Sequence, residues 1–334
     1  MENMVRWSYS TINTLKQCNR KYYFAQVMAT HGRKIPQRRK AYELKKMQNL
    51  TMWKGSVVDK FMEKTVIPAI RDKKELDFTV FGTQAVELAK NQFQFSQAKA
   101  YNDAGLKKSE ADNEFCILDM HELGKPYTEV ELAEAYETIK QAVENIPLIK
   151  MPNGTLLITY LKECNQLVPN VTNWKVEIEN ARVSPQIDLI AYHNFKPVVI
   201  DWKLSDSFIA DYSRQLIICG ITVYLKRLEG DKQPYQYSDI QLYEVNLLNG
   251  VVKKHEFSQE VINDTIDDIN RTAKDLGLLH VAYEDADIDE YGLTENEASC
   301  KLCSFRPLCI YLLLNQNEYD EESYLEFVQN NQLA

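Results

Sequence analysis

Two aspartates and a lysine, each at the end of an apolar segment, are the residues of this sequence best suited to metal-assisted chemistry. Asp188 follows Ile187, while Asp201 and Lys203 follow the apolar run 197–200. Carboxylate oxygens are good ligands for hard divalent cations, and a neighbouring ammonium can stabilise developing negative charge. These residues therefore indicate metal-assisted hydrolysis of a phosphodiester, in which the bound metal orients and activates a water.

Two short β-strands must position these side chains. Residues 187–192 and 197–203 are rich in β-forming residues, and residues 193–196 between them predict a turn. Facing side chains of such an antiparallel pair lie within about 5.5 Å of each other. Asp201 and Lys203 are two residues apart, so they point to the same face. A solvated ion pair is the alternative, but the preceding Val-Val-Ile run favours a buried strand, where charges need a partner or a purpose.

The bulk properties exclude several classes of protein. The chain has 334 residues, enough for one large domain or two ordinary ones. Hydrophobic residues make up 45% and no apolar run approaches the length of a membrane span. The first residues lack the apolar core of a signal peptide, so we expect a cytoplasmic protein. Its seven cysteines are then expected to be thiols or metal ligands and not disulfides.

Charge is unevenly distributed along the chain. The net charge is −9, yet residues 31–46 carry seven Lys or Arg against one Glu, and residues 310–334 carry five acidic groups and no basic one. The basic segment is either a solvated surface or a strip that contacts phosphates. The candidate nucleic-acid contacts in it are Arg33, Lys34, Arg38, Arg39 and Lys40.

Three cysteines near the end of the sequence form a C-x2-C-x5-C array that could converge on one soft metal. They are Cys300, Cys303 and Cys309. A structural zinc site is one explanation, and a fourth ligand is then needed. The candidates for that ligand are Cys18, Cys116, Cys164 and Cys219. Cys116 and Cys219 have apolar neighbours and are read as buried thiols, whereas cationic neighbours of Cys18 would stabilise a thiolate.

The hydrophobic periodicity predicts the remaining elements. We expect helices over about 8–28, 55–71, 79–101, 128–146, 212–228 and 259–277, and a strand-rich region from 155 to 203. Asn249-Gly250 predicts the turn of a second hairpin.

Taken in order, these motifs resemble the RecB-like branch of the PD-(D/E)XK nuclease superfamily. More narrowly, they are similar to its iron–sulfur members, the CRISPR-associated exonucleases and the nuclease domains of AddAB-type helicase–nucleases. Residues 7–24 resemble the first helix of that family, 187–203 its paired acidic motifs, and 300–309 its last cluster ligands. Residues 215–220 resemble the family's helix whose glutamine follows the active-site strands. Residues 55–63 resemble a helix that usually supplies a histidine, here replaced by Asp59.

The resemblance implies an α/β fold, a restriction-endonuclease-like core with a central mixed β-sheet flanked by helices. It implies a single nuclease domain over 1–334, with an N-terminal helix at 1–30 that carries the first cluster cysteine and a helical insertion at 75–150. The catalytic sheet core is expected at 155–257, and a C-terminal clasp that binds an iron–sulfur cluster at 298–334.

The resemblance also implies roles for individual residues. Mg²⁺ or Mn²⁺ would be held by Asp59, Asp188, Asp201 and the backbone carbonyl of Trp202. Lys203 would position the nucleophile, and Gln215 would hydrogen-bond to the lysine, the water or a phosphate. A structural [4Fe-4S] cluster would be held by Cys18, Cys300, Cys303 and Cys309, with zinc as the alternative at that site.

The expected function is that of a metal-dependent DNA nuclease, an exonuclease acting on single-stranded DNA or on DNA ends. The sequence contains no phosphate loop of the G-x4-GK[S/T] type, so any ATP-driven unwinding must come from a helicase partner. DNA repair, CRISPR adaptation and phage defence all remain open as pathways. The alternative is a non-catalytic DNA-binding or scaffolding subunit with a degenerate nuclease fold.

Overall fold

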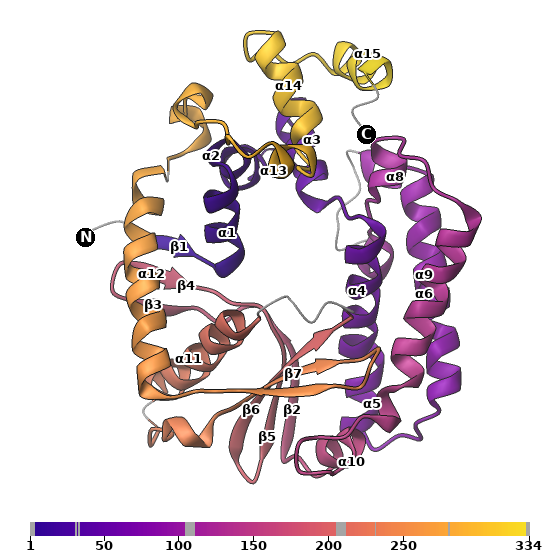
Figure 1. Cartoon of the computed structure of the whole chain (residues 1–334), viewed down its shortest axis with the longest axis vertical. Coiled ribbons are helices and arrows are strands. Elements are labelled where there is room, and N and C mark those ends of the chain that lie inside the picture. Colours follow the sequence, from indigo (N-terminus) through magenta and orange to yellow (C-terminus); the bar gives the residue numbers. More distant parts are fainter. Residues whose placement is uncertain are drawn as a thin grey trace. The chain divides into compact units, whose positions relative to one another are not determined.

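A computed structural model describes residues 4–30, 32, 34–103, 111–204, 212–230, 232–279 and 281–331 (Figure 1). The chain forms two compact units, each assembled from three segments. The first, here called the sheet unit, comprises Met1–Tyr9, Lys54–Ala89 and Ala133–Leu278. The second, here called the cysteine unit, comprises Ser10–Trp53, Lys90–Leu132 and Leu279–Ala334.

The sheet unit contains every described strand of the chain. Its strands are β1 (Val5–Trp7), β2 (Gln166–Val171), β3 (Val176–Ile178), β4 (Ala181–Val183), β5 (Ile187–His193), β6 (Lys196–Lys203), β7 (Gln241–Asn246) and β8 (Val252–His255). Its helical segments include η2 (Met62–Val66), α5 (Ile67–Arg71), α10 (Leu157–Lys162), α11 (Ser213–Glu229) and α12 (Gln259–Leu279).

The larger of the two sheets is mixed and has the strand order β2-β5-β6-β7-β8. β6 and β7 are parallel, and the other neighbours in this sheet are antiparallel. A parallel pair needs a crossover connection, and α11 lies in the chain between β6 and β7. The smaller sheet has the order β1-β4-β3. The predicted α/β architecture with a mixed sheet and flanking helices is therefore confirmed.

β6 is the central strand, and α11 packs on it. All residues from Pro197 to Trp202 are buried, as expected for a strand covered on both faces. α11 is buried from Leu216 to Val223 and contacts β6 and β7. A Cβ atom on Gly220 would lie 2.7 Å from the ring of Phe257. Only glycine therefore allows this close approach of the helix.

The cysteine unit is helical. Its elements include α1 (Tyr9–Gln17), α2 (Asn19–Tyr22), η1 (Tyr23–Met28), α3 (Pro36–Lys46), α8 (Asp119–Glu122), α13 (Glu297–Lys301), α14 (Arg306–Leu314) and α15 (Glu321–Asn331). The boundaries between the units fall within α4 (Leu50–Phe61), α6 (Phe78–Gln97) and α9 (Glu129–Glu144), and at the first residue of α1 and the last residue of α12.

Most of the predicted elements are present, with three differences. The helix expected over 8–28 is interrupted at Cys18, whose extended backbone (φ −171°) begins α2 and whose Sγ accepts a hydrogen bond from the Lys21 amide. The region expected to be strand-rich from 155 begins with helix α10. The basic segment contains a helix, α3, which starts at Pro36, since proline suits a first helical position.

The helical insertion expected over 75–150 falls into both units, because α6 and α9 each contain a boundary. Among the described helices, none is long and apolar enough to cross a bilayer.

Candidate active site

The β5–β6 hairpin brings Asp188 and Asp201 face to face. The strands pair in antiparallel register from His193 opposite Lys196 to Leu189 opposite Ile200, so one further step places the two aspartates opposite each other. The turn is only two residues long, and both Asn194 and Phe195 have positive φ, the geometry that matches the twist of a hairpin. The short turn therefore fixes the register on which the aspartate pair depends.

Asp201 is buried and Asp188 is half-buried, and both are held by specific contacts. Asp188 Oδ2 accepts a hydrogen bond from the Trp202 amide at 3.0 Å. Asp201 is only 5% exposed; its Oδ1 accepts a hydrogen bond from Gln215 Nε2 at 3.1 Å, and its Oδ2 forms an ion pair with Lys203 Nζ. Gln215 comes from the first turn of α11, so helix and sheet each contribute to the constellation.

Lys203 is held on the same side of β6 as Asp201. Its ammonium lies 4.2 Å from the centre of the Tyr212 ring. Burial alone would lower the pKa of Lys203, but Asp201, with Asp188 and Asp59, outweighs this and raises the pKa. Lys203 is therefore a permanent cation in the site.

Asp59 of α4 is the third carboxylate of the cluster. Its Oδ1 is buried and has no hydrogen-bond partner among the described residues. Burial, followed by Asp188 and Asp201, raises the pKa of Asp59 well above its usual value. Burial and Asp201 likewise raise the pKa of Asp188 to about 7. Three ionised carboxylates and one lysine together carry a net charge of about −2. Protons or a divalent cation can neutralise this charge.

The residues thus fit a divalent cation by the chemistry of their oxygen donors and by the orphaned Asp59 oxygen. In the described part of the chain, however, no group of three or more His, Cys, Asp or Glu side chains is arranged as a ligand shell. The amide of Trp202 is engaged by Asp188, and the role of its carbonyl as a ligand stays a prediction.

Three further residues close to Asp201 and Lys203 were not predicted from the sequence. Glu244 of β7 is the parallel neighbour of Asp201 in the sheet, and it pairs with His255 of β8 at 3.1 Å. Both act on Asp201: Glu244 raises its pKa and His255 lowers it, while burial remains the largest cause of the raised value. Tyr212, just before α11, covers Lys203. The Asn249-Gly250 turn predicted a hairpin here, but only the parallel pairing of β6 with β7 shows that Glu244 lies beside Asp201.

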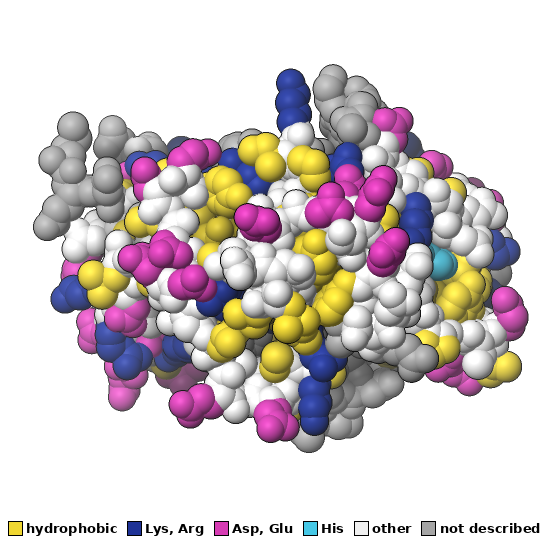
Figure 2. Space-filling view, turned by 90° about the horizontal axis from the view of Figure 1, so that it is seen from above, with side chains coloured by type: hydrophobic (Ala, Val, Ile, Leu, Met, Phe, Trp, Pro, Cys, Tyr) yellow, Lys and Arg dark blue, Asp and Glu magenta, His cyan; other side chains and the backbone are white. Residues whose placement is uncertain are grey.

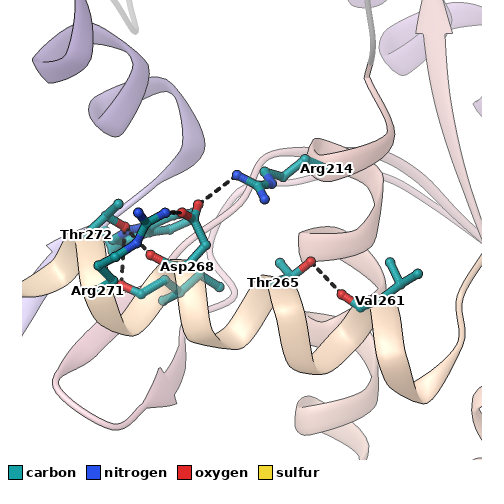
Figure 3. A network of polar contacts seen from close by, with 8 residues as sticks. Arg214, Val261, Thr265, Asp268, Arg271 and Thr272 are labelled. Carbon is teal, nitrogen blue, oxygen red and sulfur yellow. Dashed lines mark hydrogen bonds and ion pairs between the residues drawn. The ribbon is translucent and has the colours of Figure 1, made fainter.

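A second polar network ties the start of α11 to α12. Asp268 is 7% exposed and forms ion pairs with Arg214 (2.8 Å) and Arg271 (Figure 3). The Thr272 hydroxyl donates to the Asp268 carbonyl and accepts from the indole of Trp7 in β1. Because Arg214 precedes Gln215, this network anchors the turn of α11 that contacts Asp201.

Asp268→Asn is expected to cost about 1.5–3 kcal/mol of stability, because a buried carboxylate bonded to two arginines loses its charge. Urea denaturation measures this cost. Arg271→Ala is the matched control: Arg271 is 74% exposed, so its loss should cost at most about 1 kcal/mol. Equal costs for the two variants would contradict an anchoring role for Asp268.

In the cysteine unit, one cavity of about 140 Å³ brings four of the cysteines together. Cys18, Cys300, Cys303 and Cys309 all line it. Burial raises the pKa of the Cys309 thiol to about 12; Arg20 opposes this shift, and the other three cysteines add to it. Arg20, Lys21 and Arg306 line the same cavity. These cations compensate thiolate charge.

The other three thiols lie elsewhere. Cys116 and Cys219 are both 3% exposed, and Cys219 lies in the sheet unit, where its Sγ is 3.8 Å from the Gln186 carbonyl. Cys164 donates to the carbonyl of Tyr160 in the preceding turn. Of the candidate fourth ligands, Cys18 is the one that lines the cavity.

Much of the basic segment is engaged within the cysteine unit. Lys40 is 6% exposed and lies 2.6 Å from Glu43 and 2.7 Å from Glu122. Arg38 is equally buried; it donates to the carbonyl of Met28 and pairs with Glu284. Because Lys40 and Arg38 are held in these ion pairs, a phosphate would have to compete with their carboxylate partners to bind them.

The remaining residues of that prediction differ in exposure. Arg39 pairs with Glu321 at 2.8 Å, Lys34 is exposed, and Arg33 lies outside the described residues. On the face seen in Figure 2, basic and acidic side chains are interspersed with hydrophobic ones and do not form a strip of one sign. Phosphate contact by the basic segment therefore stays a prediction.

With the mixed sheet and the carboxylate–lysine site described, comparison with known families identifies the class of protein. The family model of the PD-(D/E)XK nuclease superfamily matches residues 6–310. The chain belongs to this superfamily. No curated protein sequence matches it closely enough to count as a relative.

Proposed function

We propose that this protein is a metal-dependent deoxyribonuclease whose active centre is formed by Asp59, Asp188, Asp201, Lys203 and Gln215. The single observation that carries the proposal is the cluster of three carboxylates around one lysine, in which the buried Oδ1 of Asp59 has no hydrogen-bond partner among the described residues. Membership of a nuclease superfamily agrees with it. The preferred substrate would be single-stranded DNA or DNA ends.

Each residue of the cluster has a task in this proposal. Asp59, Asp188 and Asp201 would hold Mg²⁺ or Mn²⁺, which supplies Lewis acidity towards the scissile phosphate. Lys203 places a fixed positive charge where the transition state gains negative charge. Gln215 holds Asp201 Oδ1 and leaves Oδ2 towards Lys203. The buried setting strengthens each of these electrostatic contributions relative to water.

The experiment is a cleavage assay on linear single strands, blunt duplexes and closed circular single strands, each with Mn²⁺ or with chelator. We expect metal-dependent loss of linear single strands from their ends. Cleavage of the circle would show endonucleolytic action. A protein that is inert on every form but still binds DNA would instead be a non-catalytic subunit.

We also propose that the four cysteines of the cysteine unit hold a structural [4Fe-4S] cluster. Support comes from their shared cavity and from the cations beside it. Thiolates are soft ligands that suit iron–sulfur clusters and zinc alike. A ligand set drawn from both ends of the sequence would close a long loop, which is entropically costly to hold otherwise.

Protein prepared without oxygen is expected to be brown, to absorb at roughly 400 nm and to carry about four iron atoms per chain. Cys303→Ser should lose this absorbance. Cys164→Ser is the matched control, because Cys164 lies in the sheet unit, and it should keep the colour. A colourless preparation loaded with zinc would overturn the assignment in favour of a zinc site.

A further inference from the structure

A pocket of the sheet unit, apart from the carboxylate cluster, has aromatic and basic walls. Its volume is about 600 Å³, within the usual range for small-molecule sites. Among the described residues, four aromatic and three basic side chains line it, and none of the lining side chains is a carboxylate. The aromatic ones are Trp174, Tyr192, Phe195 and Tyr235, and the basic ones are Lys226, Arg227 and Lys232. In a chain of net charge −9, such a lining favours an anionic, planar ligand.

Phe195 is the most unusual residue of this pocket. Its side chain is 77% exposed, and its φ of 62° lies in the left-handed region, which favours glycine or asparagine. Its amide donates to Asn165 Oδ1 at 2.8 Å, so the turn is held in place. The ring contributes little to the core. It is exposed to solvent in the lining of the pocket, where a planar ligand can stack on it.

The cations of the pocket are arranged beside the rings. The guanidinium of Arg227 lies 4.7 Å from the centre of the Tyr235 ring, and its Nε donates to the Gln233 carbonyl at 3.0 Å. Lys226 is neutralised by Glu229 at 2.5 Å. Arg227 and the exposed Lys232 therefore carry the net positive charge of this pocket.

The pocket lies away from the active centre but on the same elements. Tyr192 and Asp188 are four residues apart on one face of β5, which separates them by about 13 Å. Along α11, Gln215 and Arg227 are about 18 Å apart. The buried residues of α11 from Leu216 to Thr222 lie in the chain between Gln215 of the active centre and Val223, which lines the pocket. The pocket is thus a separate site and not an extension of the carboxylate cluster.

We propose that this aromatic–basic pocket binds one nucleotide, with its base stacked on Phe195 and its phosphate beside Arg227 and Lys232. Aromatic rings combined with cations are the groups that bind single-stranded nucleic acid independently of sequence. The nucleotide comes either from a strand bound at the surface or from a free mononucleotide. That a bound nucleic-acid strand is also a substrate of the enzyme rests on the proposed function. Nucleotide binding by the pocket does not rest on it.

The test measures binding, so that a failure of the nuclease assignment cannot be mistaken for a failure of the pocket. Full-length protein carrying Asp201→Asn is titrated, in chelator, with a fluorescent single-stranded oligonucleotide and separately with dAMP. Phe195→Asn is the main variant, because asparagine accepts the left-handed backbone. We expect it to keep or raise the melting temperature and to weaken binding about 5- to 150-fold, the loss expected for one stacked base.

Lys232→Ala should weaken binding of the oligonucleotide and reduce the dependence of its affinity on salt by about one ion. The matched controls are Val251→Ala and Lys253→Ala, exposed residues of the other hairpin of the same sheet, which should bind as the parent does.

Weaker binding of the oligonucleotide alone identifies a strand as the ligand, and weaker binding of dAMP alone identifies a free nucleotide. Loss of both supports a nucleotide pocket that accepts either source. The proposal is overturned if Phe195→Asn and Lys232→Ala bind both probes as tightly as the parent.

Discussion

Lys203→Met is expected to slow DNA cleavage by about 100- to 1000-fold, the usual cost of removing one preorganised electrostatic contact from a transition state. Lys203 is half-buried beside Asp201 and carries its charge permanently, because the surrounding carboxylates raise its pKa. Methionine keeps the apolar length of the side chain and removes only the ammonium. The effect should therefore appear in the rate of single-turnover cleavage and much less in affinity for DNA.

Asp201→Asn should be at least as damaging, because it removes charge from the candidate metal site while Gln215 can still reach the side chain. Lys254→Met is the matched control and should cleave at the parental rate, because Lys254 is exposed on β8 and lies opposite Tyr243, on the other face of the sheet from Asp201. A Lys203→Met protein that cleaves within about threefold of the parent would remove Lys203 from the mechanism.

Without metal, the protein is expected to lose stability as the pH rises from about 4 to about 7. In the folded state the pKa of Asp188 is raised to about 7, mainly by burial and by Asp201, whereas an unfolded chain releases this proton near pH 4. Between these values the native state binds more protons than the unfolded state, so the free energy of unfolding falls with rising pH. Asp59 acts in the same direction.

The measurement is urea denaturation at pH 5 and pH 8, with chelator and with Mn²⁺. Asp188→Asn removes the titrating group, so it should show a weaker loss between the two pH values than the parent. At pH 8, Mn²⁺ at about 100 times its dissociation constant should restore about 2.7 kcal/mol to the parent. Identical pH dependence in parent and Asp188→Asn would refute a strained carboxylate cluster.

The hairpin that carries Asp188 and Asp201 could be predicted from sequence, because alternation, a β-rich run and a short turn are local signals. The structure brings Asp59 and Gln215 to the same place, and for these residues only the family resemblance gave an indication. Glu244 could not be found, since its position beside Asp201 depends on the parallel pairing of β6 with β7.

The basic segment illustrates the opposite case. A run of positive charge is visible in the sequence, but its partners are not. Glu122 and Glu284, which pair with Lys40 and Arg38, lie far away along the chain. Tertiary pairing of this kind decides whether a cation faces solvent or is used internally, and no local pattern reports it.

The shared cavity of the cysteines has a consequence for biosynthesis. Cys18 leaves the ribosome 282 residues before Cys300, the first of the other three cysteines that line the cavity. At a translation rate of about 5–20 residues per second, roughly 15–60 s pass between the synthesis of Cys18 and that of the other three cysteines. During that time its thiol is exposed to oxidants, so the yield of intact protein should depend on the redox state of the producing cell and, under the proposed iron–sulfur assignment, on its iron supply.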